Sequence, residues 1–323
     1  MRFQNLGHRQ VSTLCLGTLP FGTHVDERTS LALLDRFAER GGTFLDTANC
    51  YSFWVAGCDG GESERLLGRW LAARGNRDEI VLATKLGALP TGAGDDWPAN
   101  REGLSAPVIH RAARQSLRRL GTDRVDLLYA HVDDHATPLA ETVAAFGDLV
   151  RDGLADQLGS SNQQLSRLAG SRELAAESGS AGYVALQQRH SYLRPAPGAH
   201  FDYQIALDDE QSAYAKARPD LTVLAYGPLL NGAYTNPAKA LPPQYDHPAA
   251  HTQLAVLREV ASELGATENQ AVLAWMLAGE TPVLPIIGVS TLAQLDEALD
   301  AVDLHLGPDH RAALDEARDA APR

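Results

Sequence analysis

The sequence predicts a closed (β/α)8 barrel, and three observations lead to this fold. The 323 residues contain eight short apolar runs with strand character, and helical patterns alternate with them along the chain. Such alternation is typical of a parallel sheet covered by helices. No Gly-x-Gly-x-x-Gly turn follows a strand pattern, which disfavours a dinucleotide-binding doubly wound sheet. We therefore expect a single barrel domain over residues 1–323.

A β-hairpin is expected before the barrel. It turns at Leu6-Gly7-His8, and its second arm runs on as the first barrel strand, which ends at Gly17-Thr18. Further strands are expected at residues 43–46, 80–85, 125–131, 183–187, 221–226 and 283–288, with a weak fifth strand ending near Leu158. Helices are expected at residues 27–40, 63–71, 105–120, 138–151, from 162 onward, and at 251–264, 268–277 and 292–301. Ser63 is the expected N-cap of the second helix.

Long loops follow several predicted strands. They cover residues 51–61, 86–104, 189–207 and 227–247. In a barrel these loops lie at the C-terminal face and shape the substrate pocket. The expected pocket residues are Phe21, Tyr51, Trp54, Trp97 and His131, with Tyr192, Phe201 and Tyr234 as further aromatic candidates.

Three ionisable side chains lie where predicted strands end. Asp46, Lys85 and His131 close the second, third and fourth strands, and Tyr51 lies in the loop after Asp46. Because the C-terminal strand ends of a (β/α)8 barrel carry its active site, we expect these four side chains to meet.

These four residue types suit acid catalysis of carbonyl reduction. A phenol has a pKa of about 10, so Tyr51 donates a proton poorly near neutral pH unless a positive neighbour stabilises the phenolate. Lys85 can supply that charge, and Asp46 can hold Lys85 in place. His131, as a neutral imidazole, can orient a carbonyl group. Tyr51 would then protonate the oxygen while a hydride reaches the carbon.

Other interpretations stay open from the residues alone. Asp46 and Lys85 could form a structural ion pair inside the barrel, and His131 could be an ordinary buried histidine. Lys85 could also act as a base or a Schiff-base nucleophile in a lyase or epimerase.

Composition restricts the class of protein. The chain has 41 acidic and 28 basic residues, so its formal net charge is -13, which argues against a nucleic-acid partner or a polybasic membrane contact. No apolar run approaches the roughly 20 residues of a membrane span. Three cysteines without a Cys-x-x-Cys motif indicate a reduced, cytoplasmic chain and no metal site. A small-molecule partner is expected, and the choice between a monomer and a homo-oligomer stays open.

Ordered pieces along the whole chain resemble the aldo-keto reductases. They are Asp46-Thr47-Ala48 with Tyr51, Glu62-Ser63-Glu64, Ala83-Thr84-Lys85, Leu127 to His131, Ser160-Ser161-Asn162, Gln187, Ala225-Tyr226-Gly227-Pro228-Leu229 and Pro285-Ile286-Ile287-Gly288. The resemblance implies an enzyme that reduces an aldehyde or ketone with NAD(P)H. It also assigns Tyr51 as the proton donor of a catalytic tetrad with Asp46, Lys85 and His131.

The resemblance implies a set of cofactor contacts as well. Ser161, Asn162 and Gln187 match residues that hold the nicotinamide carboxamide, and Tyr226 matches the aromatic residue on which that ring stacks. The other implied contacts are Gly17, Thr18, Asp46, Gly227, Pro228, Leu229, Gly232, Gly288, Ser290, Gln294 and Glu297.

The family generally takes NADPH, so NADP(H) is the expected cofactor. Relatives often place a lysine or arginine around residues 288–294 to meet the 2′-phosphate, whereas this chain has neither between Thr281 and His310. Losing a charge-assisted contact keeps NAD(H) as an alternative. The alternative function is a cofactor-binding regulatory subunit, similar to the potassium-channel β subunits that share this barrel.

Overall fold

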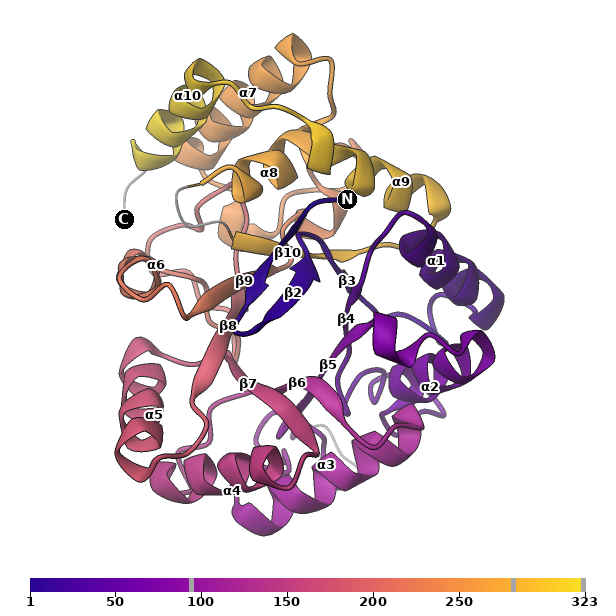
Figure 1. Ribbon diagram of the computed structural model, residues 1–323. Helices are drawn as coiled ribbons and strands as arrows, with labels where there is room; N and C mark the ends of the chain where they lie inside the picture. Colours follow the sequence, from indigo (N-terminus) through magenta and orange to yellow (C-terminus); the bar gives the residue numbers. More distant parts are fainter. Residues whose placement is uncertain (93–95, 280–282, 321–323) are drawn as a thin grey trace.

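Eight parallel strands close into a barrel in the order β10-β3-β4-β5-β6-β7-β8-β9 (Figure 1), which confirms the predicted fold. The computed structural model describes residues 1–92, 96–279 and 283–320. The barrel strands are β3 (Cys15–Gly17), β4 (Phe44–Asp46), β5 (Val81–Leu86), β6 (Val125–Ala130), β7 (Ala155–Ser161), β8 (Tyr183–Arg189), β9 (Thr222–Tyr226) and β10 (Val283–Gly288).

Helices surround the barrel, and several of them present an apolar stripe to it. In α3, for example, Ile109, Ala113 and Leu117 recur at helical spacing and are buried, and Gly121 ends the helix with a φ of 64°. The helices are α1 (Glu27–Glu39), α2 (Glu62–Arg74), α3 (Ala106–Leu120), α4 (Leu139–Arg151), α5 (Leu165–Ser178), α6 (Asp209–Lys216), α7 (Pro248–Glu263), α8 (Glu268–Leu277), α9 (Leu292–Asp300) and α10 (Pro308–Asp319). Helices α7 and α10 pack on each other outside the ring (Figure 1).

The structure corrects the expected N-terminal arm and one helix cap. The arm is not continuous, because β2 ends at Ser12 and the barrel strand β3 begins at Cys15. Ser63 is not an N-cap but lies inside α2, whose N-cap is Gly61 with a φ of 84°. The Ser63 side chain is fully buried, and its hydroxyl donates to the carbonyl of Thr18.

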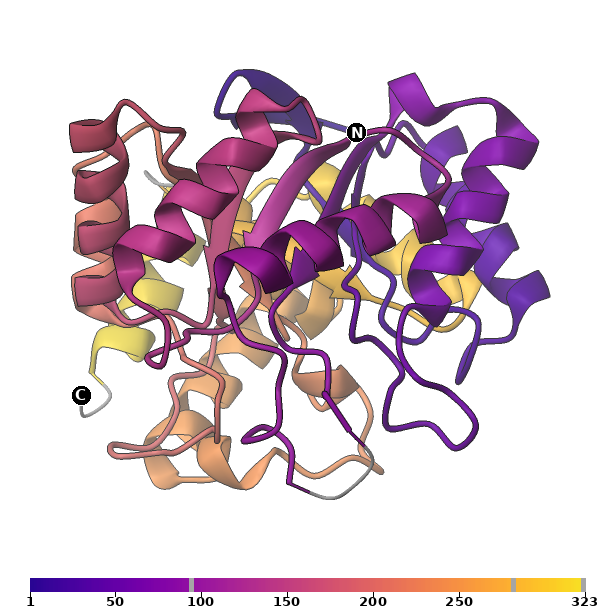
Figure 2. The ribbon, with the colours of Figure 1, turned by 90° about the horizontal axis from the view of Figure 1, so that it is seen from below.

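The N-terminal hairpin closes one end of the barrel. Strands β1 (Phe3–Leu6) and β2 (Arg9–Ser12) pair antiparallel and lie across the barrel opening in Figure 1. Their side chains Leu6 and Val11 are completely buried in the apolar cluster that fills the barrel. In Figure 2 the hairpin lies at the top of the molecule and the long loops at the bottom.

Side-chain alternation explains how the barrel builds a polar site above an apolar interior. Phe44, Ala83 and Tyr129 belong to the interior cluster. Because successive side chains of a strand alternate between its two faces, the residues two positions further on point the same way, at the C-terminal mouth. Gly159 in the next strand leaves room for this packing, since a Cβ there would lie 2.5 Å from the ring carbon Cε1 of Tyr129.

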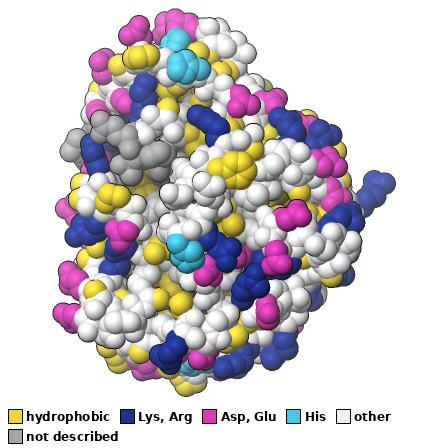
Figure 3. Space-filling model, viewed as in Figure 1, with side chains coloured by type: hydrophobic (Ala, Val, Ile, Leu, Met, Phe, Trp, Pro, Cys, Tyr) yellow, Lys and Arg dark blue, Asp and Glu magenta, His cyan; other side chains and the backbone are white. Residues whose placement is uncertain are grey.

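The molecular surface carries both signs of charge. On the face seen in Figure 3, lysine and arginine side chains are interspersed with aspartate and glutamate. Among the helices of the described ranges, none is long and apolar enough to cross a membrane.

Candidate active site

The structure brings the Lys85 ammonium, the Asp46 carboxylate and the Tyr51 phenol together. The Lys85 Nζ atom lies 2.5 Å from Asp46 Oδ2 and 2.7 Å from the Tyr51 hydroxyl oxygen, and it donates to the carbonyl of Thr47 at 2.8 Å. Lys85 and Asp46 are buried. Asp46 ends β4, and Lys85 is the penultimate residue of the neighbouring strand β5.

A turn after β4 positions Tyr51. It continues the backbone pairing with β5, because Thr47 N donates to the Ala83 carbonyl and Asn49 N donates to the Lys85 carbonyl. The Asn49 side chain donates to Glu102 Oε1 at 2.7 Å, which fastens the turn to the loop after β5. The turn therefore returns Tyr51 over the ammonium of Lys85.

The charge of Lys85 favours the phenolate form of Tyr51, but other effects set the net direction of the pKa shift. Burial, followed by the nearby Asp46 carboxylate, raises the pKa of the Tyr51 phenol well above its ordinary value. The positive charge of Lys85 is balanced by Asp46 at 2.5 Å. Tyr51 is therefore a neutral phenol at pH 7, which is the form that can donate a proton.

His131 follows β6 and packs beside Tyr51. The two rings meet edge to face with their centroids 6.0 Å apart. Burial, followed by the positive charge of Lys85, lowers the pKa of His131 well below its usual range. The imidazole is therefore neutral at pH 7, as the sequence predicts, and its Nδ1 lies 3.5 Å from Cys50 Sγ.

The residues matched to carboxamide binding also lie at this mouth, but several of their polar atoms already form hydrogen bonds within the protein. Asn162, with a φ of 54°, donates through Nδ2 to the His131 carbonyl and to Ser161 Oγ. Its Oδ1 accepts from the Tyr226 hydroxyl at 2.7 Å. Gln187 Nε2 donates to Asp46 Oδ1 at 3.0 Å, so Gln187 also orients the carboxylate that holds Lys85.

Two of the expected cofactor contacts have structural partners. The Thr18 hydroxyl is buried and donates to the Asp46 carbonyl at 3.0 Å. Its neighbour Gly17 pairs with both β4 and β10. These residues fix the start of the Asp46 turn.

The turn after β9 forms an open cradle. Gly227 and Gly232 have φ angles of 67° and 87°, and a Cβ added at Gly227 would meet no atom within 4 Å. Pro228 and Leu229 lie between them. Lys239 donates to the carbonyl of Asn231 at 2.5 Å, which puts a positive charge beside this turn. Sequence reasoning missed Lys239, because it lies in an irregular loop with no strand-end signal.

The start of α9 is exposed and polar. Ser290 donates through both its backbone N and its hydroxyl to Gln294 Oε1, and Thr291 caps the helix. A Cβ added at Gly288 would meet no atom within 4 Å. Glu297 accepts from Thr267 Oγ1 at 2.7 Å, so it ties α9 to the start of α8.

Aromatic side chains form a wall beside Tyr51. Trp97 lies between Phe53 and Tyr203, with ring centroids 5.3 Å and 4.5 Å away, and Phe53 also contacts the half-exposed Trp54. Phe53 and Tyr203 pack against the small apolar cluster that Tyr51 contacts. Sequence reasoning missed both.

Three aromatic candidates do not line this wall. Phe21, Tyr192 and Tyr234 are buried in apolar core clusters, which leaves them almost no exposed surface for a substrate. The expectation that these side chains line the pocket is therefore wrong.

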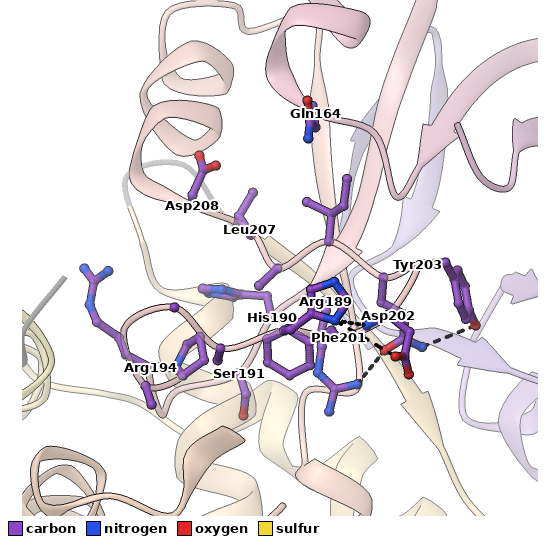
Figure 4. A pocket seen from close by; sticks show the side chains of 18 of the residues that line it. Gln164, Arg189, His190, Ser191, Arg194, Phe201, Asp202, Tyr203, Leu207 and Asp208 are labelled. Atoms are coloured by element: carbon purple, nitrogen blue, oxygen red, sulfur yellow. Dashed lines mark hydrogen bonds and ion pairs between the residues drawn. The ribbon is translucent and has the colours of Figure 1, made fainter. Parts of the chain in front are cut away.

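A cavity of 870 Å³ is lined mainly by the loop that follows β8, and Tyr203 of the aromatic wall is one of its lining residues (Figure 4). Arg189, His190, Phe201 and Tyr203 line it, together with Arg318 from α10. Tyr203 belongs both to this cavity and to the wall beside Tyr51, whereas the four tetrad side chains do not line it.

Comparisons with known proteins agree with this geometry. The family model described as "Aldo/keto reductase family" matches residues 13–319. The chain is 34% identical over 320 residues to "Uncharacterized oxidoreductase YrpG" of Bacillus subtilis, covering 95% of this chain and 92% of that protein. It is 32% identical to "Norsolorinic acid reductase stcV" of Emericella nidulans, covering 92% of this chain and 76% of that protein. "Aldo-keto reductase str7" of Strobilurus tenacellus is 29% identical, with coverages of 90% and 80%.

The barrel, its strand-end site and these matches together define an oxidoreductase class. The chain belongs to the aldo/keto reductase family.

Proposed function

We propose that this protein reduces an aldehyde or ketone group of a small molecule to an alcohol, with a hydride from NAD(P)H. One observation carries the proposal: a single buried ammonium, Lys85 Nζ, lies 2.7 Å from the Tyr51 hydroxyl and 2.5 Å from Asp46 Oδ2. Such a group stabilises the phenolate that remains when Tyr51 gives up its proton.

Two features of the chain fit a nicotinamide dinucleotide. The open glycine turn at 227–232, with Lys239 beside it, suits a pyrophosphate, and the start of α9 offers backbone N–H groups and hydroxyls to a second phosphate. Gln187 contacts Asp46, Ser161 contacts Asn162, and Tyr226 directly precedes that turn. These three side chains would hold the nicotinamide end. The cofactor supplies the hydride when it is bound.

The tetrad side chains divide the remaining work. His131, neutral at pH 7, orients the carbonyl oxygen by hydrogen bonding. Tyr51 delivers the proton to that oxygen, and Lys85 stabilises the resulting phenolate. Asp46, held by Gln187, keeps Lys85 in position. The wall of Phe53, Trp97 and Tyr203 excludes water and favours flat carbonyl compounds.

The proposal includes a cofactor preference and a cellular location. NADP(H) is the favoured cofactor and NAD(H) the alternative, because Ser290 and Gln294 offer hydrogen bonds but no charge to a 2′-phosphate. The free thiols of Cys15, Cys50 and Cys58 support a reducing, cytoplasmic location.

The alternative of a regulatory subunit on the same barrel has no structural observation of its own in its favour. The names of the relatives, a norsolorinic acid reductase among them, support the enzyme.

A titration tests the proposal directly. Purified protein is titrated with NADPH and with NADH while intrinsic and cofactor fluorescence are read, and aldehydes and ketones are then added while the absorbance of the reduced cofactor is followed. We expect binding and substrate-dependent oxidation of the cofactor. Binding without turnover over a broad panel would favour the regulatory alternative, and absence of binding would overturn the cofactor assignment.

A further inference from the structure

We propose that Cys50 is a positioning residue for His131, because its thiol donates a hydrogen bond to Nδ1 and thereby keeps the imidazole proton on Nε2. The inference rests on the proposed function and deepens it. It assigns a role to a side chain that was not among the site residues expected from the sequence.

The contact between the two side chains is specific and enclosed. Cys50 Sγ lies 3.5 Å from His131 Nδ1, within the range of a hydrogen bond to sulfur. Cys50 is 3% exposed and His131 is 9% exposed, so water has little access to this contact. The turn that places Tyr51 over Lys85 also sets the position of Cys50, because the two residues are adjacent.

The chemistry of the two groups fixes the direction of the hydrogen bond. Burial raises the pKa of Cys50 to about 12, so the thiol keeps its proton at pH 7. A neutral imidazole nitrogen accepts hydrogen bonds well, whereas a thiol sulfur is a weak acceptor. The S–H group is therefore the donor, and Nδ1 is the acceptor with a free lone pair.

The tautomer of His131 follows from that direction. A neutral imidazole carries one proton, so an accepting Nδ1 leaves the proton on Nε2. In the part of the chain that the structure describes, Nε2 has no hydrogen-bond partner, and it is the nitrogen left for a ligand. An Nε2–H group attracts a carbonyl oxygen, whereas the other tautomer would present a lone pair to it.

A space-filling role is the competing explanation. Cys50 also belongs to a small apolar cluster with Ala48, Ala88 and Val132, and a side chain of similar size would maintain that packing. Cys50→Val keeps the volume and removes the donor, whereas Cys50→Ser keeps a donor in a smaller side chain. Comparing the two variants therefore separates hydrogen bonding from packing.

The test measures the tautomer itself and does not depend on turnover. Protein labelled with ¹⁵N-histidine is examined by long-range ¹H–¹⁵N correlation at pH 7.5, and the His131 signals are assigned by their absence in His131→Asn. We expect a protonated Nε2 and an unprotonated Nδ1 in the wild type and in Cys50→Ser. In Cys50→Val we expect the two ¹⁵N shifts to move towards each other, as in a mixture of tautomers.

Kinetics and a control complete the test. Cys50→Val should lower kcat/KM by roughly twofold to tenfold, the effect of one hydrogen bond, and Cys50→Ser should recover part of that loss. Cys58→Val, which removes the partly exposed thiol later in the same loop, should change neither readout. A wild type with the proton on Nδ1, or His131 shifts unchanged in Cys50→Val, would overturn the proposal. Because the NMR readout needs no cofactor or substrate, the tautomer and the reductase function succeed or fail separately.

Discussion

The Lys85 ammonium lies 2.7 Å from the phenolic oxygen of Tyr51, and the same nitrogen is 2.5 Å from Asp46 Oδ2. One cation thus faces two oxygens of different acidity inside the barrel mouth. Asp46 balances its charge, so the phenol keeps its proton until a better acceptor arrives. The proton-donor role of Tyr51 depends on this arrangement.

Replacing Tyr51 tests that role. We expect Tyr51→Phe to lower kcat for carbonyl reduction by about 10²-fold to 10⁴-fold, because it removes the general acid. Cofactor affinity, measured by fluorescence titration, should stay nearly unchanged. Tyr203→Phe is the matched control, since Tyr203 is a pocket-wall tyrosine whose hydroxyl contacts Gln204. Wild-type turnover in Tyr51→Phe would remove Tyr51 from the mechanism.

Stability should fall as the pH drops below about 6.5, in part through His190. Burial, followed by the positive charges of Arg318 and Arg194, lowers the pKa of His190 well below its ordinary value. Below pH 6.5 the unfolded chain binds a proton that the folded chain does not, so the free energy of unfolding falls by up to about 1.4 kcal/mol per pH unit for one histidine.

His190→Phe should make the free energy of unfolding less sensitive to pH, and the phenyl ring can keep the stacking of His190 on Trp275. Urea unfolding at pH 7.5 and pH 5.5 measures the change for each variant. His200→Phe is the control, because the His200 side chain is 82% exposed. Equal pH sensitivity of His190→Phe and wild type would contradict the assignment.

Asp126 links the hairpin to the barrel. Its buried carboxylate lies 3.2 Å from Arg9 of β2 and 2.9 Å from Arg77, and it accepts from the backbone N of Leu82. Asp126→Asn should lower the free energy of unfolding by about 2 to 4 kcal/mol, since it removes the carboxylate partner of the partly buried Arg77 and leaves Arg9 with Asp156 alone. Urea denaturation measures the change. Asp123→Asn, at a side chain 89% exposed, should have little effect. Similar losses in both variants would argue against a special role for Asp126.

Gln294 tests the phosphate end of the proposed cofactor site. Gln294→Arg should raise the preference for NADPH over NADH by roughly tenfold, because it supplies the missing charge at the exposed start of α9. The ratio of the two dissociation constants is the measurement. Gln10→Arg adds the same charge on the hairpin, at the opposite end of the barrel, and should leave the ratio unchanged. An unaltered ratio in Gln294→Arg would show that the 2′-phosphate does not reach this helix.

The barrel was predictable because its strands are apolar and its glycines mark helix ends, but two helices were not. In α6 the buried side chains are Gln211 and Ala215, and in α10 they are Leu314 and Arg318. Neither helix repeats apolar residues at helical spacing. Tertiary packing, and not the local sequence pattern, therefore determines that these two segments are helical. Strand β7 looked weak for a related reason: its Gly159 has no side chain, and Tyr129 takes that space.

The site was predictable where strand register alone decides it. Asp46 is the last and Lys85 the penultimate residue of neighbouring strands, so the fold brings them together. Cys50 and Tyr203 could not be found in this way, because loop conformations place them against His131 and Trp97. The direction of the Tyr51 pKa shift depends on how deeply the phenol is buried and on how the charge of Lys85 is balanced. The sequence does not give either quantity.

The hairpin described above also bears on the order of events during turnover. Leu6 and Val11 close the N-terminal end of the barrel, so ligands reach Tyr51 through the mouth that the loops line. Cofactor and substrate would both enter through this mouth, and one of them would lie deeper than the other. The deeper ligand must then bind first and dissociate last. We therefore expect an ordered reaction. The loops around the mouth, and not the chemical step at the strand ends, would limit the rate at which the deeper ligand is released.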